Sequence, residues 1–566
     1  MKNMNYKQVD IEDNTSSKSK DSKKIIFYEY IFFTLISFLL ATSSTLYLGI
    51  ICHNLAAKYN FKLKGLVKSY SVLGGYRDFS DFQWRYYRGN LHLIIIFAFI
   101  FIFISKMIKK YLDIDYLKYF YLLFGFGYAF FLHRIKIIYL ILVLLASYSL
   151  CINYSIFGRK WFISLTWILC IIIKATSEIW NGYGINFLQV SDFFEYPLLG
   201  WQSVFGFNML RIISFNMEYS DFMEKNISIE SLISIDKVKN HCKECNEGKF
   251  CLTALKFIFL KETDFSFLNL LIYIFYPPFY FSGPIIMFQS FIFQVNNYRI
   301  NKHNNFFDKK RLYLIRCICI FIILEIFNHY IYVNAIMTNR DNNWIFEEFR
   351  KNYSYYNYAF LAFNNLVFTF LKFSLIWKIA RLWGWVDGVY AEENMNRCIY
   401  NNYSFEGFWR QWHRSYNIWL IRYIYIPLGG RKKRIFNTFI IFTFVALWHD
   451  LQLNLLIWAW FIYICLIPEV IIKNHFNNEK RQYLNNKMWF RYLRAWVCSA
   501  VILLMIAANL IGFGIGNKEL VDTLMYLLKL MTVKRFIFVT VILSPFTFTM
   551  FFIRDLEQKN GIKKKF

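Results

Sequence analysis

FEGFWRQWHRSYNIWLIRYIYIPLGG, residues 405–430, combines tryptophans and arginines with a single histidine and ends in Pro-Leu-Gly-Gly. The surrounding chain of 566 residues is 57% hydrophobic and 22% aromatic, a composition typical of membrane proteins. An ionisable side chain in such surroundings is costly unless it has a structural or functional reason to be there. The histidine of this stretch, His413, is therefore the first residue to explain.

Apolar runs of roughly 17 to 25 residues can cross a bilayer core about 30 Å thick. The sequence predicts an all-α polytopic membrane protein with about eleven or twelve transmembrane helices, together with re-entrant or interfacial helices. The clearest runs lie near 27–51, 91–108, 116–132, 135–152, 161–175, 265–293, 312–337, 358–380, 436–472, 495–515 and 535–553. We expect a polar, disordered tail at 1–26, a membrane domain at 27–555 and a basic tail at 556–566.

The net charge of +28 does not indicate a nucleic-acid partner. Lysines and arginines gather in short stretches between apolar runs, as in SKMIKK (105–110), RINKHNNFFDKKR (299–311) and GGRKKR (429–434). This distribution is typical of cytoplasmic loops that face anionic lipid. Membrane lipids are the expected partners of this charge.

Eleven cysteines are scattered, mostly singly within apolar runs, where a thiol behaves as a small buried hydrophobic group. The exception is HCKECNEGKFC, which contains His241, Cys242, Cys245 and Cys251. Zinc binding would require a second pair of ligands, and the alternatives are a reduced, lipidated or disulfide-linked loop. We expect no metal site.

Three polar regions interrupt the apolar runs, at 52–90, 176–264 and 381–434. Non-helical backbone at membrane depth must be buried in protein or face a water-filled cavity. These regions are therefore expected to line a cavity, and chemistry should be sought there. No internal repeat is evident, which disfavours a transporter built from inverted repeats.

A continuous helix over 408–420 would place the histidine on an aromatic face and Arg410 and Arg414 on the opposite face. That aromatic face would consist of Trp409, Trp412, His413, Tyr416 and Trp419. One interpretation is an interfacial helix with a tryptophan belt and snorkelling arginines. The other interpretation is a functional histidine.

Two of the nine histidines lie deep within apolar runs. His329 follows Glu325 by one helical turn, so the two side chains are placed to hydrogen-bond. His449 ends the run NTFIIFTFVALWHD and precedes Asp450. An intramembrane ionisable residue is by default a functional-site candidate.

The run FWRQWHRSYNIWLIRYIYIPLGG followed by ALWHD resembles the signature of the membrane-bound O-acyltransferase (MBOAT) superfamily, with the second histidine thirty-six residues after the first. Within it, the chain is similar to the glycerol-uptake-protein (Gup) and Hedgehog-acyltransferase-like branch. The segments that carry this further similarity are SDFQWRYYRGNL (80–91), MLRIISFNMEY (209–219), YPPFYFSGPI (276–285), RLWGWVDGVYAEENMNRCIYNNYS (381–404) and NLIGFGIG (509–516).

The resemblance implies that His449 is the catalytic histidine and that His413 fills the second polar position. It also implies an MBOAT fold, in which a ring of tilted helices surrounds a central tunnel. A histidine at the second position favours the Gup branch over the Hedgehog-type palmitoyltransferases. The further residues expected to bind substrates are Trp409, Arg410, Trp412, Tyr416, Asn417, Asp387, Asn402, Arg431 and Lys432.

Chemically, a histidine can accept the proton of an attacking hydroxyl, because its pKa ordinarily lies near neutrality. His449 would be this base, and His413 could donate a hydrogen bond to the developing oxyanion. Acyl-CoA would be the co-substrate, with no other cofactor. The basic stretch from Arg431 would suit the phosphates of coenzyme A, although a positive cytoplasmic loop explains it equally well.

Resemblance to the Gup branch implies acylation of a lyso-lipid of glycosylphosphatidylinositol (GPI) anchors in the endoplasmic reticulum. The terminal Lys563-Lys564-Lys565-Phe566 is similar to a di-lysine retrieval signal for that compartment, or is simply a basic flank. The alternative functions are a glycerol/proton transporter using Glu325 and His329, a Hedgehog-acyltransferase-like protein acyltransferase, and a catalytically silent regulator.

Overall fold

The computed structural model describes residues 16–59, 63–69, 74–183, 199–225, 255, 260–298, 307–338, 355–476, 483–484, 487–514 and 532–560. Almost all of these residues are helical, which confirms the predicted all-α class. The cysteine-containing motif at 241–251 and the terminal lysines at 563–565 lie outside the described residues.

Eight helical stretches of the described chain are long and apolar enough to cross a membrane. They are Phe27–Tyr59 within α1 (Ser16–Tyr59), α3 (Leu91–Tyr111), Ile114–Ile152 comprising α4 (Ile114–His133) and α5 (Ile137–Ile152), α6 (Tyr154–Ile179), Lys310–Tyr330 within α13 (Phe307–Tyr330), α20 (Leu453–Phe476), Met488–Phe513 including α21 (Met488–Asn509), and α23 (Val533–Lys559). The chain is a multi-pass membrane protein.

The number of such helices is lower than the predicted eleven or twelve, for identifiable reasons. The run 265–293 is divided into α11 (Phe267–Phe275), a 3-10 turn at Pro277–Phe279 and α12 (Phe288–Asn296), because proline has no backbone N–H to continue a helix. The runs 116–132 and 135–152 fall in the single stretch Ile114–Ile152. The run 436–472, which is long enough for two crossings, forms α19 (Arg434–His449), with only 16 residues, and α20. The run 358–380 lies within α16 (Tyr355–Asp387).

Helices extend into both predicted tails. α1 begins at Ser16, within the tail predicted to end at residue 26, and α23 continues to Lys559. α1 and the last turns of α23 are joined, since the Tyr30 hydroxyl donates to Asp555 Oδ2 at 2.9 Å.

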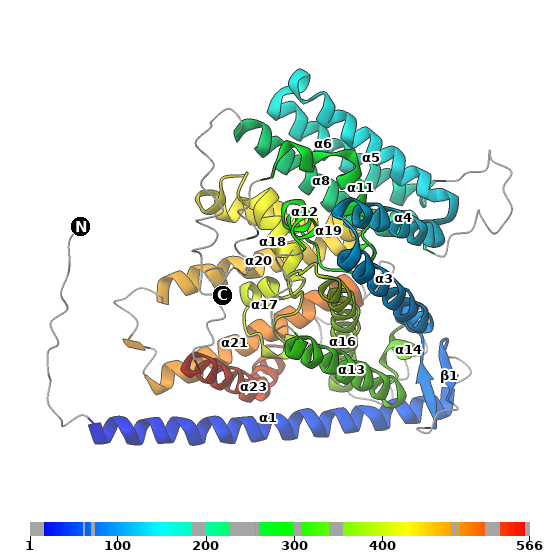
Figure 1. Cartoon of the computed structure of the whole chain (residues 1–566). Coiled ribbons are helices and arrows are strands. Elements are labelled where there is room, and N and C mark those ends of the chain that lie inside the picture. Colours follow the sequence, from blue (N-terminus) through cyan, green and yellow to red (C-terminus); the bar gives the residue numbers. More distant parts are fainter. Residues whose placement is uncertain are drawn as a thin grey trace, which may run out of the picture.

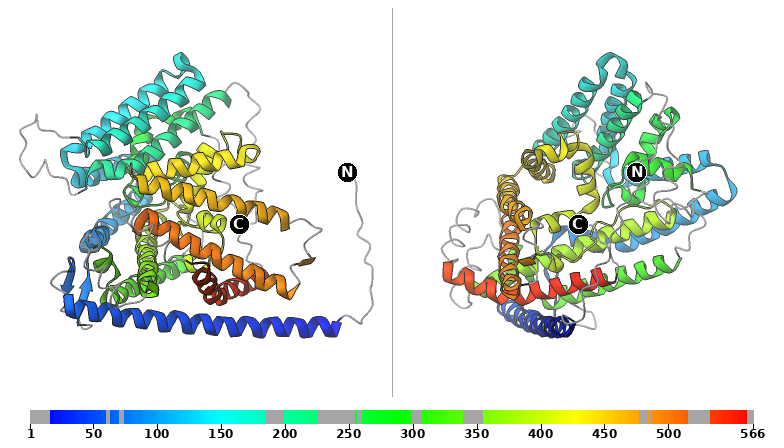
Figure 2. Two further views of the ribbon diagram at one scale, coloured as in Figure 1. Left: turned by 180° about the vertical axis from the view of Figure 1, so that it is seen from behind. Right: turned by 90° about the vertical axis from the view of Figure 1, so that its left-hand side faces the viewer.

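Figures 1 and 2 show α1 along one edge of the molecule, with α21 and α23 beside it, and α5 and α6 at the opposite edge. Short helices lie between these edges, including α17 (Phe405–Gln411) and α18 (Arg414–Leu420). Helix α8 (Trp201–Lys225) is buried along most of its length. Its Arg211 side chain donates to the carbonyl oxygens of Ile274 and Phe279, which fixes the break between α11 and α12.

The polar region 52–90 contains the two described strands, β1 (Leu66–Lys68) and β2 (Tyr76–Asp78), which pair antiparallel. Asp78 accepts hydrogen bonds from Ser80 N at 3.0 Å and from Ala335 N at 2.9 Å. The second bond ties the hairpin to α14 (Val333–Thr338). Helix α2 (Phe82–Gly89) follows, capped by Asp81, whose Oδ1 accepts from Trp84 N at 2.6 Å.

Candidate active site

The chain is kinked between α17 and α18, at His413. This residue has φ 45° and ψ 49°, a left-handed conformation uncommon for a residue other than glycine. Asn394 holds the kink, because its carbonyl and side-chain oxygens accept from Arg414 N at 3.1 Å and Ser415 N at 3.2 Å. The helix supposed over 408–420 is therefore interrupted at residues 412 and 413, between α17 and α18.

The kink also separates the two arginines that were predicted to share a helix face. Arg410 pairs with Glu406 at 2.5 Å, whereas Arg414 lies 3.5 Å from Glu392. The two arginines therefore form ion pairs with different acidic residues.

The His413 imidazole is 6% exposed and is sandwiched by aromatic rings. It stacks on Trp377 of α16, with ring centroids 4.5 Å apart and planes 13° apart. Tyr416 lies at 5.3 Å and Trp448 at 6.2 Å, measured between centroids. Nε2 of His413 is buried and has no hydrogen-bond partner among the described residues, so the protein leaves its hydrogen-bonding capacity unused.

His449 is the last residue of α19. The helix ends because Asp450 is extended, and the Asp450 carboxylate accepts from Leu451 N at 2.7 Å and Gln452 Nε2 at 2.6 Å. The carboxylate thus stabilises the turn into α20. Because both of its oxygens are used in this turn, the Asp450 carboxylate does not orient the imidazole.

Three aromatic rings surround the His449 imidazole edge-on. The ring centroids of Trp448, Trp458 and Phe513 lie 4.9, 6.1 and 5.6 Å from that of His449. The imidazole itself remains open to a cavity, and the described chain offers it no hydrogen bond. These contacts fix the plane of the ring without occupying its nitrogens.

Trp448 connects the two histidines. Its indole ring lies next to His449 and 6.2 Å from His413, while Tyr416 packs on it at 4.5 Å. Its Nε1 donates to the Gly206 carbonyl oxygen at 2.9 Å, which anchors the ring to α8. One aromatic group therefore sets the relative position of both imidazoles.

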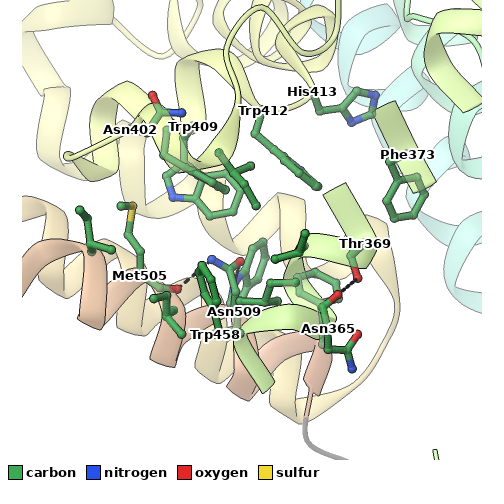
Figure 3. A pocket seen from close by; sticks show the side chains of 18 of the residues that line it. Asn365, Thr369, Phe373, Asn402, Trp409, Trp412, His413, Trp458, Met505 and Asn509 are labelled. Atoms are coloured by element: carbon green, nitrogen blue, oxygen red, sulfur yellow. Dashed lines mark hydrogen bonds between the residues drawn. The ribbon is translucent and has the colours of Figure 1, made fainter. Parts of the chain in front are cut away.

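Both histidines line one cavity of about 2320 Å³. The residues around it come from helices distant in sequence, and Figure 3 shows Trp409 and Asn402 on one side and Thr369 and Asn365 on the other. Two further buried polar atoms of lining residues, the Tyr416 hydroxyl and Trp409 Nε1, have no hydrogen-bond partner in the described structure. Buried polar atoms without a partner are costly, so the lining is suited to a bound molecule.

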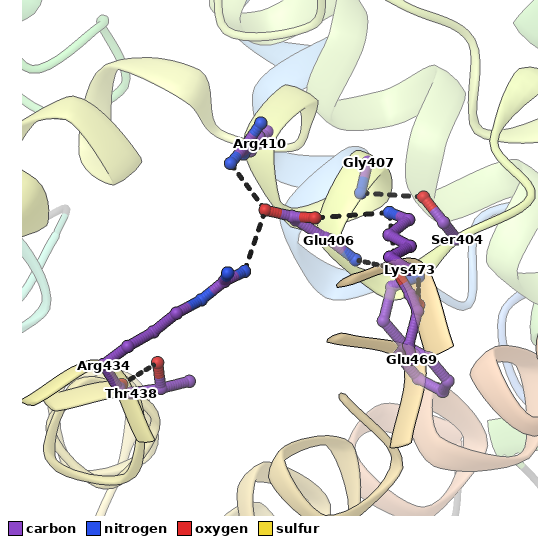
Figure 4. Close-up of polar contacts among 9 residues, drawn as sticks. Ser404, Glu406, Gly407, Arg410, Arg434, Thr438, Glu469 and Lys473 are labelled. Carbon is purple, nitrogen blue, oxygen red and sulfur yellow. Dashed lines mark hydrogen bonds and ion pairs between the residues drawn. The ribbon is translucent and has the colours of Figure 1, made fainter. Parts of the chain in front are cut away.

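A basic cluster lines another part of the same cavity. Glu406 Oε1 receives Arg410 at 2.5 Å and Arg434 at 3.2 Å, and its Oε2 receives Lys473 at 3.2 Å (Figure 4). Arg431 also lines the cavity. Lys473, which does not itself line the cavity, also pairs with Glu469 at 2.9 Å. Two carboxylates thus face three cations, and Arg431 adds a further positive charge, so this part of the wall favours an anionic group.

Most of the predicted site residues are brought together. The lining includes His413, His449, Asn402, Trp409, Arg410, Trp412, Tyr416, Asn417 and Arg431. Lys432 does not line this cavity, although its neighbour Arg431 does.

Asp387 does not line the cavity either. Its buried carboxylate accepts hydrogen bonds from the Tyr276 hydroxyl at 2.5 Å, the Tyr121 hydroxyl at 2.6 Å and Lys109 Nζ at 2.9 Å. Ser105 donates to it at 2.5 Å. This network joins α3, α4 and α16 to the Pro277 turn, and the predicted substrate contact of Asp387 remains a prediction.

The pair Glu325 and His329 differs from expectation. The His329 imidazole contacts the backbone carbonyl of Glu325, with Nδ1 at 2.8 Å from the oxygen, and not the carboxylate. The carboxylate is paired with Arg77 at 3.1 Å and Arg88 at 3.0 Å. These arginines link the hairpin and α2 to α13, which is a structural role.

Sequence reasoning missed the aromatic residues that hold the histidines, namely Trp377, Trp448, Trp458 and Phe513. Trp448 is adjacent to His449 in sequence and was a visible candidate. Trp377 precedes His413 by thirty-six residues, and no local pattern connects them.

Comparison with known proteins identifies the family. The family model described as "MBOAT, membrane-bound O-acyltransferase family" matches residues 149–508, more than half of the chain. The chain is 31% identical over 507 residues to "Membrane-bound O-acyltransferase GUP1" of Candida tropicalis, covering 88% of this chain and 83% of that protein.

Two further relatives place the chain within the family. It is 32% identical over 503 residues to "Membrane-bound O-acyltransferase gup1" of Schizosaccharomyces pombe, covering 86% of this chain and 81% of that protein. It is also 28% identical over 194 residues to "Protein-cysteine N-palmitoyltransferase HHAT" of Mus musculus, covering 34% and 37% of the two chains. The chain is an acyltransferase that belongs to the membrane-bound O-acyltransferase family, in the branch of the Gup and Hedgehog-acyltransferase-like proteins.

Proposed function

We propose that this protein transfers a fatty acyl group from acyl-CoA to a hydroxyl of a lyso-lipid, the lyso-lipid of GPI anchors being the preferred acceptor, in the endoplasmic reticulum membrane. The observation that supports it most is a single cavity lined by His449, His413 and the basic cluster. Such a cavity can hold a long, partly anionic acyl donor and bring its reacting carbon to an ionisable base.

His449 serves as the general base in this mechanism. As the acceptor oxygen attacks the thioester carbon, its proton passes to a free nitrogen of the imidazole. The tetrahedral intermediate then collapses, the carbon–sulfur bond breaks, and the departing thiolate takes the proton from the imidazolium. The products are the acylated lipid and free coenzyme A.

His413 stabilises negative charge on the carbonyl oxygen. Its Nε2 lacks a partner among the described residues, and in the tautomer that is protonated there it can donate to the developing oxyanion. Stacking on Trp377 fixes the ring before the reaction. A donor that is already oriented costs little reorganisation in the transition state.

Arg431, Arg434 and Arg410 supply the positive charge for the phosphates of coenzyme A. Arg434 and His449 are the first and last residues of α19, which has 16 residues. At 1.5 Å per residue, the helix spans about 22 Å between them. This separation suits a donor whose charged groups are far from its thioester.

A reconstitution experiment tests the function. Purified protein in lipid nanodiscs receives radiolabelled palmitoyl-CoA together with lysophosphatidylinositol or with glycerol, and the labelled lipid products are separated. We expect a labelled diacyl product from the lyso-lipid. The absence of lipid acylation, with glycerol flux in sealed vesicles instead, would refute the proposal in favour of transport.

The acceptor in cells is tested by lipid analysis of GPI-anchored proteins. Cells that lack this protein should accumulate anchors with one acyl chain fewer, and the wild-type gene should restore them. A His449→Ala gene that restores the anchors fully would contradict the role of the histidine.

A further inference from the structure

A lysine lines the cavity on the side of His449, apart from the basic cluster. Lys174 of α6 lines the same cavity as His449 and is 7% exposed. It belongs to Tyr154–Ile179, one of the stretches that are long and apolar enough to span a membrane. An ammonium group in such a stretch is costly unless it is paired or has a function.

Lys174 is paired with a residue outside the cavity wall. Its Nζ donates to Glu178 Oε1, one helical turn further along α6. Glu178 is not among the described residues that line the cavity. The pair is therefore neutral as a whole, with its positive end nearer the cavity.

Two contacts show that α6 and α8 run antiparallel. Arg159 of α6 pairs with Asp221 of α8 at 3.0 Å. Seven residues further along α6, Thr166 Oγ1 accepts from Asn216 Nδ2 at 3.0 Å. The residue number on α8 falls as the number on α6 rises, so the end of α6 lies beside the start of α8.

This register places Lys174 beside the anchor of Trp448. Lys174 lies eight residues beyond Thr166, about 12 Å along the helix axis, and is therefore level with the segment of α8 that contains Gly206. The Gly206 carbonyl oxygen accepts from Trp448 Nε1 at 2.9 Å. Because Trp448 directly precedes His449, Lys174 lies close to His449.

A contact between α6 and α19 leads to the same place. The ring centroids of Trp167 and Phe444 lie 5.7 Å apart, and both helices continue from this contact toward Gly206. Lys174 follows Trp167 by seven residues on the same face of α6, about 10 Å along the axis. His449 follows Phe444 by five residues on α19, about 7.5 Å along the axis. At this position the charge of Lys174 acts on the His449 imidazole.

The other ionisable groups near the imidazole are Asp450 and His413. Asp450 acts with the opposite sign to Lys174, and its oxygens are held in the turn into α20. The charges of His413 and His449 oppose each other when both rings are protonated. The aromatic residues of this centre are uncharged at neutral pH, namely Tyr416, Trp448, Trp458 and Phe513. Lys174 is thus the lysine or arginine, among the described residues, whose charge acts on His449.

We infer that Lys174 is a positioning residue for the base, because its ammonium group keeps the His449 imidazole in the neutral form that accepts a proton. This inference rests on the proposed function, in which His449 takes the proton of the acceptor hydroxyl. A positive charge close by makes an imidazolium less favourable. The resting imidazole therefore stays neutral, and the imidazolium formed during the attack readily gives its proton to the departing thiolate of coenzyme A.

Chemical modification measures the ionisation of His449 directly. Diethyl pyrocarbonate reacts with a neutral imidazole and not with an imidazolium, and His449 is open to the cavity. Full-length protein in nanodiscs is treated briefly at a series of pH values, and mass spectrometry gives the modification rate of the peptide that contains His449. The pH at half-maximal rate is the midpoint of ionisation. His92, an exposed histidine of α3, is the internal reference in the same digest.

Removal of the positive charge should raise this midpoint. Lys174→Met combined with Glu178→Gln removes both members of the pair, so that no charge is left unpaired, and should raise the His449 midpoint by about half a pH unit or more. Lys174→Met alone should raise it further, because the Glu178 carboxylate then attracts the imidazolium. Lys174→Arg keeps the charge and should leave the midpoint unchanged. Lys160→Met removes the same charge at an exposed residue near the other end of α6 and is the matched control.

An unchanged His449 midpoint in both variants that lack Lys174 would overturn the inference. An equal upward shift in Lys174→Arg would also overturn it, because packing and not charge would then be responsible. The acid limb of the kcat/KM profile for acyl transfer should move together with the modification midpoint.

The modification assay needs no turnover, so the two claims can fail separately. A shifted midpoint in a protein without acyl transfer, or with an acid limb that does not move, would refute the proposed function alone. Active enzyme whose His449 midpoint does not depend on Lys174 would refute the inference alone.

Discussion

The indole of Trp377 lies flat against the imidazole of His413, with ring centroids 4.5 Å apart and planes inclined by 13°. Trp377 belongs to α16, whereas His413 lies in the left-handed conformation at the kink between α17 and α18. Stacking of this kind contributes about 0.5–1.5 kcal/mol beyond the burial of the rings. The backbone of His413 is not helical, so the stack on Trp377 is the contact that fixes the orientation of the imidazole.

Trp377→Leu should lower kcat about tenfold, because the His413 ring then gains freedom to rotate. Trp377→Phe keeps an aromatic face and should lose less. Both variants are compared by kcat, KM and thermal midpoint in purified protein. Equal kcat values for the leucine variant and the wild type would show that the stack does not position His413.

Gly512→Ala should impair the enzyme through Trp458. A Cβ at Gly512 would lie 2.7 Å from Trp458 Cγ, so the indole must move, and this ring packs against His449. Overpacking of this kind costs about 1–3 kcal/mol. We expect a lower thermal midpoint and reduced acyl transfer.

Gly127→Ala is the matched control, because a Cβ at Gly127 of α4 meets no atom within 4 Å. It should leave activity unchanged and stabilise the helix by about 0.5–1 kcal/mol. If Gly512→Ala and Gly127→Ala have the same thermal midpoint and the same rate of acyl transfer, displacement of Trp458 is not the cause.

Arg431→Ala should raise KM for acyl-CoA about tenfold with little change in kcat, because a charge-assisted contact to phosphate is worth about 1.5–3 kcal/mol. Lys432→Ala removes an adjacent charge that does not line the cavity and should change KM by less than about twofold. Initial rates across a range of acyl-CoA concentrations, at low and high salt, give KM for both variants. Equal effects of the two substitutions would indicate general electrostatic attraction to the loop.

The stability of the hairpin region should depend on pH through Asp78. Burial raises the pKa of this carboxyl from 3.8 to about 6, against hydrogen bonds from Ser80 and Ala335 that lower it. Because the folded protein holds the proton more tightly than the unfolded chain, this group contributes stability below pH 4 that is lost as the pH rises through about 6.

Asp78→Asn cannot ionise and should flatten this pH dependence. Thermal midpoints measured between pH 4.5 and 7.5 test the prediction. Asp115→Asn, at an exposed residue of α4, is the control for the loss of one carboxylate. If the thermal midpoint of Asp78→Asn changed with pH as much as that of the wild type, Asp78 would not be the group responsible.

Sequence reasoning predicted the class of fold from the long apolar runs, which are long enough to cross a bilayer. It also singled out His413 and His449 as candidate site residues, because an ionisable side chain within an apolar run is costly unless it has a role. His413 and His449 line one cavity, and most of the residues predicted to bind substrates line it too. The run 265–293 was predicted from its length as a crossing, and the structure shows that it is broken at the prolines 277 and 278.

The kink at His413 could not be predicted from the local sequence. The aromatic spacing of 409–419 fits a helix, but Asn394 satisfies the backbone N–H groups of Arg414 and Ser415 from a distant loop. The network around Asp387 is similarly non-local, since it joins side chains from residue 105 to residue 387. Contacts of this kind depend on the packing of the whole chain and leave no periodic pattern.

The central claim is that His449 takes the proton of the attacking hydroxyl, and single-turnover acyl transfer tests it most directly. Purified His449→Ala, loaded with radiolabelled palmitoyl-CoA and mixed with lysophosphatidylinositol, should form product about 10²- to 10⁴-fold more slowly than wild type. It should bind acyl-CoA with unchanged affinity, and His92→Ala, at an exposed histidine of α3, should react at the normal rate. A wild-type rate of product formation by His449→Ala would contradict the mechanism.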